Sequence, residues 1–73
     1  MSGDYWVRIQ HEGVKRDEDS EAAILFKARG ILADGTPTDE VWLPRSQIQE
    51  HDDEEAVIPQ WLADDRGLDW EYL

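Results

Sequence analysis

The sequence contains no cysteine, little basic charge and no long apolar run. The absence of cysteine excludes disulfide bonds, cysteine-ligated zinc, iron–sulfur clusters and thiol catalysis. It also agrees with a reducing compartment. No apolar stretch approaches the roughly 18 residues of a membrane-spanning helix, and the opening MSGDYWVR has no signal-peptide pattern. We therefore expect a cytoplasmic protein that makes no membrane contact.

Acidic residues far outnumber the basic ones. The 73 residues include 18 Asp and Glu against 7 Lys and Arg, which leaves a formal charge of −11. Such a chain repels nucleic acid and anionic lipid, so an electrostatic partner should be a basic protein. Solubility alone needs a net charge of only about 2–8 on a small domain. The excess therefore favours a negative field that serves a function.

The chain is nevertheless predicted to fold. Hydrophobic residues make up 40% of it, and they occur in periodic blocks separated by acidic runs. Four Trp, two Tyr and one Phe supply large side chains, whose burial offsets chain entropy in a small core. At this length we expect a single domain over residues 1–73.

Two stretches alternate between apolar and polar residues, which is typical of strands with one buried face. The first covers residues 4–10, with Val7 and Ile9 on one face. The second covers residues 22–32, with Phe26 facing inward. A helix is also possible there, because Ala, Leu, Lys and Arg favour it, but Gly30 and the turn that follows favour a strand. The polar run between them, HEGVKRDEDSE, predicts a loop or a long hairpin connection.

Turn signals follow in the middle of the chain. Asp34 and Gly35 predict a turn, and Pro37 predicts a second bend before a third strand over residues 40–44. Residues 45–49 extend the apolar pattern past a proline, so we expect this strand to lie at an edge or to carry a bulge.

The C-terminal part predicts a short strand, a helix and an open ending. The strand, residues 56–58, follows the acidic run EHDDEE, which is expected to be a hairpin tip or an exposed loop. Pro59 suits the first turn of a helix over residues 60–66. Gly67 is expected to end that helix in the left-handed conformation, with Leu68 packing back. The tail, DWEYL, either adds a last strand or wraps around the core.

Together these elements predict an α+β fold, namely a small antiparallel sheet of four to five short strands with one short C-terminal helix. Trp42 and Trp61 stand in the apolar blocks that would pack strand against helix, so we expect both in the core. His11 and His51 stand in polar runs and are expected in exposed loops.

Carboxylates gather in two runs, residues 17–21 and residues 50–55. On a body with a radius of gyration of about 11 Å, such acids approach the charge density of duplex DNA, which is one charge per ~1.7 Å. A groove built for phosphates would accept them, because carboxylates take the same bidentate arginine contacts. The expected partner-binding residues are Asp52, Asp53, Glu54 and Glu55 with Glu50, followed by Asp17, Glu18, Asp19 and Glu21.

Calcium binding and catalysis fit these acids less well. Asp17, Asp19 and Glu21 alternate as the first ligands of an EF-hand loop do, but Ala22 and Ala28 occupy the positions that need Gly and Glu. The acids stand in polar runs, away from the apolar surroundings that catalysis by paired carboxylates requires. No serine lies in a nucleophile elbow, and the glycines are isolated. We expect no metal, no cofactor and no enzymatic activity.

The aromatic residues support an alternative hypothesis. Trp6 and Trp70 stand beside charged residues on a strand and in the tail, where they would be partly exposed. Tryptophan contributes strongly to binding energy at many protein interfaces. The alternative is therefore a non-enzymatic interaction module that binds through an aromatic patch, with the acids serving solubility.

Two motifs carry a resemblance to known proteins. The segment VWLPRSQI, residues 41–48, is followed by VIPQWLADDRGL, residues 57–68. Small proteins of phages and mobile elements share a similar W-(L/I)-P-(K/R)-S-Q-I segment and a P-x-W-L-A helix that ends in Gly-Leu. The preceding AAILFKA block is similar to their strand ahead of the turn, so the resemblance covers residues 22–68. It marks a fold more than an activity.

Size and acidity further resemble the DNA-mimicking anti-CRISPR proteins of phages, including inhibitors of type I surveillance complexes. This second resemblance rests on composition. It implies a protein of the bacterial host cytoplasm, a monomer or small homo-oligomer, that blocks target DNA binding by occupying a basic groove on a Cas complex subunit. No catalytic residues carry over, because that class acts by binding.

Overall fold

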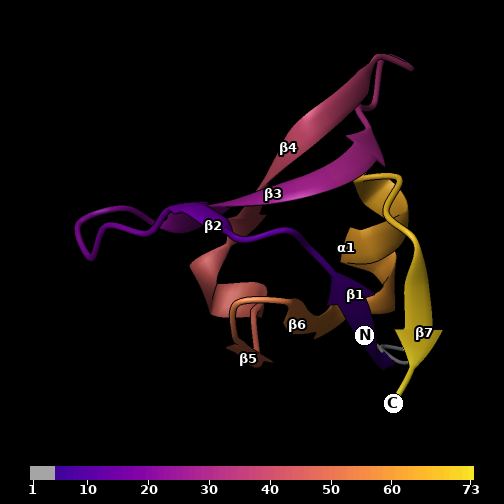
Figure 1. Ribbon diagram of the computed structural model, residues 1–73. Coiled ribbons are helices and arrows are strands. Elements are labelled where there is room, and N and C mark those ends of the chain that lie inside the picture. The colour runs from indigo at the N-terminus through magenta and orange to yellow at the C-terminus, as the bar shows by residue number, and fades with distance from the viewer. Residues whose placement is uncertain (1–4) are drawn as a thin grey trace.

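Seven short strands form two antiparallel sheets in the computed structural model, which describes residues 5–73 (Figure 1). Residue 4, with which the first strand was predicted to begin, lies outside the described residues. The first sheet has the order β5–β6–β1–β7, with β1 at Trp6–Gln10, β5 at Glu50–His51, β6 at Glu55–Pro59 and β7 at Trp70–Tyr72. The second has the order β2–β3–β4, with β2 at Val14–Arg16, β3 at Ala23–Ile31 and β4 at Pro37–Pro44.

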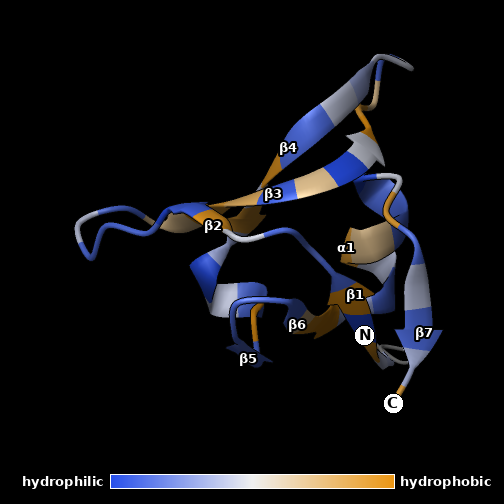
Figure 2. Cartoon of the chain, viewed as in Figure 1, coloured by the Kyte–Doolittle hydropathy of each residue, from blue (hydrophilic) through white to orange (hydrophobic). Residues whose placement is uncertain are grey.

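One hydrophobic cluster joins the two sheets and the single α-helix, α1, at Gln60–Asp65. Figure 2 shows apolar colours in β1 and β6, whereas the β2–β3 loop and the β5–β6 turn are hydrophilic. Burying aliphatic and aromatic side chains stabilises a core by about 1.5–3 kcal/mol each. The largest fully buried side chains are Phe26, Ile9, Ile24, Leu43, Ile58, Leu62 and Val7.

The predicted alternation is confirmed in the first two long strands. Val7 and Ile9 of β1 are buried, and the β3 face that holds Phe26 and Ala28 is buried opposite exposed Lys27. The period of a strand is two, so alternation alone assigns each side chain to a face.

The prediction of four to five strands in one sheet is wrong. Two short strands, β2 and β5, lie in runs that are polar and exposed. They form by pairing with buried strands: Val14 opposes Phe26, and Glu50 opposes Val57. Neither strand has a hydrophobic face of its own. The sequence therefore shows no alternation of apolar and polar residues there that would predict a strand.

Two details around β4 also differ from the prediction. Pro37 does not make a separate bend, because it is the first residue of β4, a place that an edge strand allows. The strand does not continue past Pro44. Residues Arg45–Gln47 form a 3-10 turn, η1, that leads away toward β5.

The helix and its end are confirmed. Gly67 has a φ of +65°, and its N–H donates to the Asp64 carbonyl at 3.1 Å. The Leu68 N–H donates to the Ala63 carbonyl at 2.9 Å, and Leu68 is buried. These two bonds are the glycine-terminated helix ending known as the Schellman motif. Within residues 5–73, no helix has the length and apolar character needed to cross a bilayer.

The turn at Asp34 and Gly35 and the final strand are also present. Gly35 has a φ of +88°, and its N–H donates to the Leu32 carbonyl at 2.9 Å. Of the two alternatives for the tail, strand formation is the one observed, because β7 pairs with β1 and places Tyr72 opposite Val7.

Candidate functional site

The β5–β6 hairpin holds the predicted acidic run of residues 50–55. We call its five carboxylates the acidic hairpin, which consists of Glu50, Asp52, Asp53, Glu54 and Glu55. The hairpin closes through a bond from the Asp52 N–H to the Glu55 carbonyl at 2.9 Å. The Asp52 carboxylate also accepts the N–H groups of Glu54 and Glu55, both at 2.8 Å. A side chain therefore holds the tip in one conformation.

Those same backbone donors affect the ionisation of Asp52. Hydrogen bonds from the N–H groups of Glu54 and Glu55 lower its pKa from the ordinary 3.8, because they favour the charged carboxylate. Folding of the hairpin therefore favours the ionised form of Asp52, and ionisation of Asp52 favours the folded turn.

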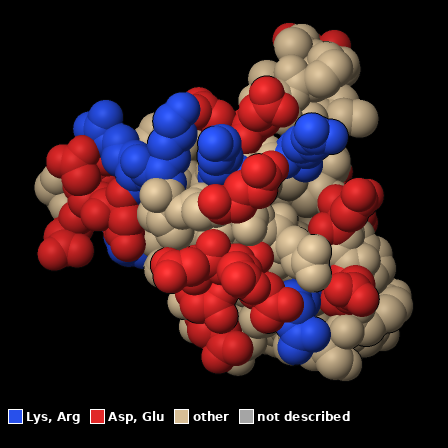
Figure 3. All heavy atoms as spheres, in the orientation of Figure 1, with Lys and Arg blue, Asp and Glu red and all other residues tan. Residues whose placement is uncertain are grey.

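Within residues 5–73, the acidic hairpin has one ion pair with a basic side chain. The Arg8 Nε lies 3.6 Å from the Glu55 carboxylate. Glu50, Asp52, Asp53 and Glu54 form no ion pair in the described part of the chain. In Figure 3, carboxylates crowd the surface over this hairpin, while Lys and Arg form a row over the other sheet. The hairpin is thus a negative surface with little internal compensation.

The other predicted run, residues 17–21, forms the loop between β2 and β3, and three of its four carboxylates form ion pairs with Arg16 and Arg45. Arg16 lies 2.7 Å from both Glu18 and Glu21, and Arg45 lies 2.7 Å from Asp17. Arg45 also donates to the carbonyl of Glu18 at 2.9 Å. The Glu21 hydrogen bond is the main cause that raises the pKa of Arg16, and the charge of Glu18 adds to it.

The two runs therefore do not form one surface of equal character. Both are largely exposed, as expected, with Glu21 and Glu55 half-buried. Asp17, Glu18 and Glu21 form ion pairs with arginines of the same chain. Asp19 belongs to none of these pairs in the described residues. Arg16 stands next to this run in the sequence, but the contact of Arg45 with Asp17 joins residues 28 positions apart and could not be predicted from it.

His11 is the residue whose environment was predicted wrongly. It is only 7% exposed and stacks edge to face on Phe26, with ring centroids 4.7 Å apart. Its Nδ1 accepts the Gly13 N–H at 3.0 Å, so the proton is on Nε2, which donates to the Glu55 carbonyl at 3.2 Å. The ring thus fastens the end of β1 to the start of β6. His51 is exposed as expected, but it stands in β5 and not in a loop, and its ring also lies against Phe26, with centroids 5.6 Å apart.

The prediction that Trp42 and Trp61 belong to the core is also wrong. Trp42 is 42% exposed and Trp61 is 48% exposed. Val41 and Leu43 point into the core, so alternation turns Trp42 outward, and α1 buries Leu62 instead of Trp61. A block of apolar residues indicates that a strand or helix packs against the core. Which of its side chains are buried depends on the periodicity of that strand or helix.

The other two tryptophans lie where the alternative hypothesis needs them. Trp6 is exposed, and Trp70 is half-buried against the core. The indole N–H of Trp70 donates to Asp64 at 2.8 Å, and its ring meets Tyr72 edge to face at 4.9 Å. Tyr72 in turn meets Tyr5 edge to face at 6.3 Å.

Metal-ligating side chains do not assemble in the part of the chain that the structure describes. No group of three or more His, Asp or Glu side chains is placed there to hold one ion. Comparison of the chain with protein-family models, with curated proteins and with solved structures finds no match.

Proposed function

We propose that this protein binds a basic nucleic-acid-binding protein through the acidic hairpin and so blocks access of DNA to that partner. The observation that carries the proposal is the contrast between the two acidic runs. Arg16 and Arg45 compensate the β2–β3 loop, whereas four carboxylates of the hairpin form no ion pair within residues 5–73. Carboxylates without internal partners are the ones available to arginines of another protein.

Rigidity of the hairpin adds to the argument. Binding costs less when a loop is already ordered, because its conformational entropy is lost on folding and not on association. The two bonds that Asp52 accepts order this tip before any partner arrives. The partner of first choice is a subunit of a type I Cas surveillance complex, in keeping with the resemblance to DNA-mimicking anti-CRISPR proteins.

The test uses two variants that remove equal charge. The hairpin variant carries Glu50→Gln, Asp52→Asn, Asp53→Asn and Glu54→Gln, which keeps Glu55 for Arg8 and an oxygen acceptor at position 52. The loop variant carries Asp17→Asn, Glu18→Gln, Asp19→Asn and Glu21→Gln. Each is mixed with a purified type I surveillance complex, and target DNA binding is measured at several salt concentrations.

We expect the hairpin variant to inhibit at least about tenfold more weakly, since each exposed ion pair contributes ~0.2–1 kcal/mol. The loop variant should remain close to the original protein. Inhibition by the original protein should weaken steeply with salt. If both variants inhibit as well as the original protein, the electrostatic proposal is wrong.

The exposed aromatic residues favour a second candidate, an interaction module that binds through its aromatic surface. Trp6, Trp42 and Trp61 each expose more than two-fifths of their surface, which is unusual for the largest apolar side chain. Binding of this kind depends little on salt. Trp6→Ala and Trp42→Ala should then abolish capture of the surveillance complex, while the hairpin variant should not.

A further inference from the structure

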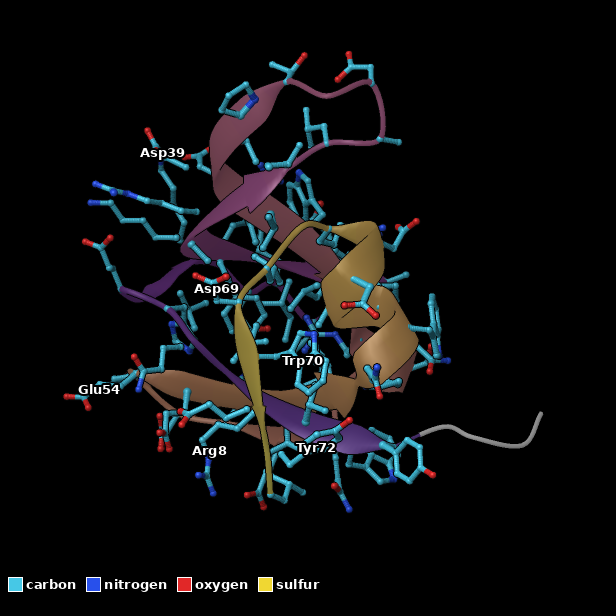
Figure 4. All side chains as sticks on the ribbon, turned by 90° about the vertical axis from the view of Figure 1, so that its right-hand side faces the viewer. Arg8, Asp39, Glu54, Asp69, Trp70 and Tyr72 are labelled. Carbon is cyan, nitrogen blue, oxygen red and sulfur yellow. The ribbon has the colours of Figure 1, made fainter. Side chains whose placement is uncertain are left out.

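Within residues 5–73 the two sheets have four edge strands, and β4 is the longest of them. β5 has two residues, and β2 and β7 have three each, whereas β4 has eight. A short edge strand offers few unpaired backbone groups to another chain, but a long one is a template for strand addition. In Figures 1 and 4 the β3–β4 hairpin also extends beyond α1.

The register between β3 and β4 determines which backbone groups face the free edge of β4. The Arg45 N–H donates to the Ala22 carbonyl at 2.7 Å, so these two residues form a hydrogen-bonded pair. Bonded and non-bonded pairs alternate along an antiparallel ladder. Counted back from Arg45 in unbroken register, Trp42 and Glu40 belong to non-bonded pairs. The N–H and C=O groups of Glu40 and Trp42 therefore point away from β3, toward the free edge.

Side chains of the same chain already bond to these outward groups. The Thr38 hydroxyl accepts the Glu40 N–H at 3.2 Å and donates to the Glu40 carbonyl at 2.9 Å. The Arg66 Nε, at the end of α1, donates to the Trp42 carbonyl at 3.1 Å. Three of the four outward N–H and C=O groups of Glu40 and Trp42 thus have a partner within the chain.

The sequence of β4 suits pairing with a second copy of itself. Antiparallel pairing around a twofold axis at Val41 sets Glu40 opposite Trp42 of the second copy, so that the outward groups of these residues face each other. Asp39, which points into solvent in Figure 4, falls opposite Leu43 of the second copy. No two carboxylates oppose each other in this register, and like charges directly opposite would have destabilised it.

We propose that Thr38 and Arg66 close the edge of β4 against strand addition, and that the opened edge pairs with β4 of a second copy. The Thr38 hydroxyl bonds to both backbone groups of Glu40 that a second strand needs. The Arg66 guanidinium occupies the place of the incoming N–H donor at the Trp42 carbonyl. The inference does not rest on the proposed function, because the acidic hairpin belongs to the other sheet.

The test variant carries Thr38→Val and Arg66→Met, which keep most of the size of the two side chains and remove their polar groups. The control variant carries Thr36→Val and Arg29→Met, which make the same changes of residue type and charge at exposed positions outside β4. Sedimentation velocity of the full-length proteins over a concentration series measures their association. A salt concentration of about 150 mM limits the repulsion between acidic copies.

We expect the test variant to associate at least about tenfold more tightly than the original protein, since one or two net hydrogen bonds suffice for that factor. The control variant should sediment as the original protein does. In the associated form, the amides of Glu40 and Trp42 should exchange their hydrogens more slowly than in the control variant. Thr38→Ser, which keeps the hydroxyl, should leave association unchanged.

Two results would overturn this inference. One is a test variant that associates no more tightly than the control variant, and the other is association that leaves the Glu40 and Trp42 amides unprotected. Circular dichroism during heating shows whether the test variant is folded. If it is unfolded, Thr38→Val alone is compared with Thr36→Val alone, because each removes one hydroxyl and no charge, and the same two results decide.

Discussion

Gly67 occupies a position where any side chain would collide with β3. Its φ is +65°, and a Cβ there would lie 2.7 Å from the Ile31 nitrogen. The end of α1 rests directly on this strand, since the Ile31 N–H also donates to the Arg66 carbonyl at 2.9 Å. A small residue at the helix end thus sets how closely helix and sheet pack.

Gly67→Ala should therefore destabilise the protein by more than backbone strain alone, which costs about 1–3 kcal/mol. Gly35→Ala is the matched control, because Gly35 also has a positive φ but open space around it. Urea unfolding followed by tryptophan fluorescence measures both. Equal losses at the two positions would show that contact with Ile31 contributes nothing.

Phe26 and Trp42 lie on neighbouring strands yet differ completely in burial. Phe26 is fully buried against His11, whereas Trp42 points outward. Truncation of a buried aromatic costs about 3–5 kcal/mol, comparable to the whole stability of a domain this small. Phe26→Ala should yield a largely unfolded chain and Trp42→Ala a folded one, as measured by circular dichroism during heating. An unfolded Trp42→Ala variant would contradict this assignment.

At the scale of the element, the acidic hairpin combines a turn with a titrating group. Folding lowers the pKa of Asp52, chiefly through the hydrogen bonds from the backbone of Glu54 and Glu55. A group with a lowered pKa contributes stability above its unfolded pKa, and that contribution is lost as the pH falls through the folded pKa. The hairpin is therefore stabilised by Asp52 at neutral pH and not in acid.

This predicts a pH-dependent difference between variants. Asp52→Ala should be less stable than the original protein at pH 7, and the gap should close as the pH falls below the ordinary carboxyl value of 3.8. Asp52→Asn retains an oxygen that accepts the same N–H groups, so its stability relative to Asp52→Ala should not change with pH. Thermal melts from pH 2 to pH 7, within roughly the range where carboxylates titrate, measure both differences. A constant gap for Asp52→Ala would refute the role of ionisation.

At the scale of the whole molecule, a charge of −11 is spread over a body with a radius of gyration of 11.4 Å. Five of the seven basic side chains form ion pairs, with Arg16 and Arg45 serving the β2–β3 loop. Four of the carboxylates without an ion pair in the described residues lie together on the acidic hairpin. Self-repulsion of this kind destabilises a compact state.

Salt should accordingly stabilise the protein. Raising the salt concentration from about 10 mM to about 150 mM shortens the Debye length from ~30 Å to ~8 Å and screens the repulsion. We expect the melting temperature to rise over this range, and to rise less in the hairpin variant, from which four like charges are removed. Calorimetry measures both, and an equal rise in the two proteins would place the repulsion elsewhere.

The sequence by itself determined which faces of β1 and β3 are buried and where α1 begins and ends. The alternation of apolar and polar residues assigned Val7 and Phe26 to the core, and Pro59 and Gly67 marked the two ends of α1. Both predictions succeed because side-chain periodicity and backbone constraints are local properties of the chain. It also determined that the surface is acidic. The pairing of Arg16 with Glu18 and Glu21 is local, but the contact of Arg45 with Asp17 is not.

Tertiary structure decided the rest. It formed β2 and β5, which have no apolar face, by pairing them with buried strands. It buried His11 through a bond to the Glu55 carbonyl, 44 positions away, and brought Arg45 to Asp17. It also paired β7 with β1 at the end of the first sheet. Each of these features depends on which distant segments of the chain become neighbours. A pattern along the chain specifies the buried face of a strand or helix but not the segment that pairs or packs with it.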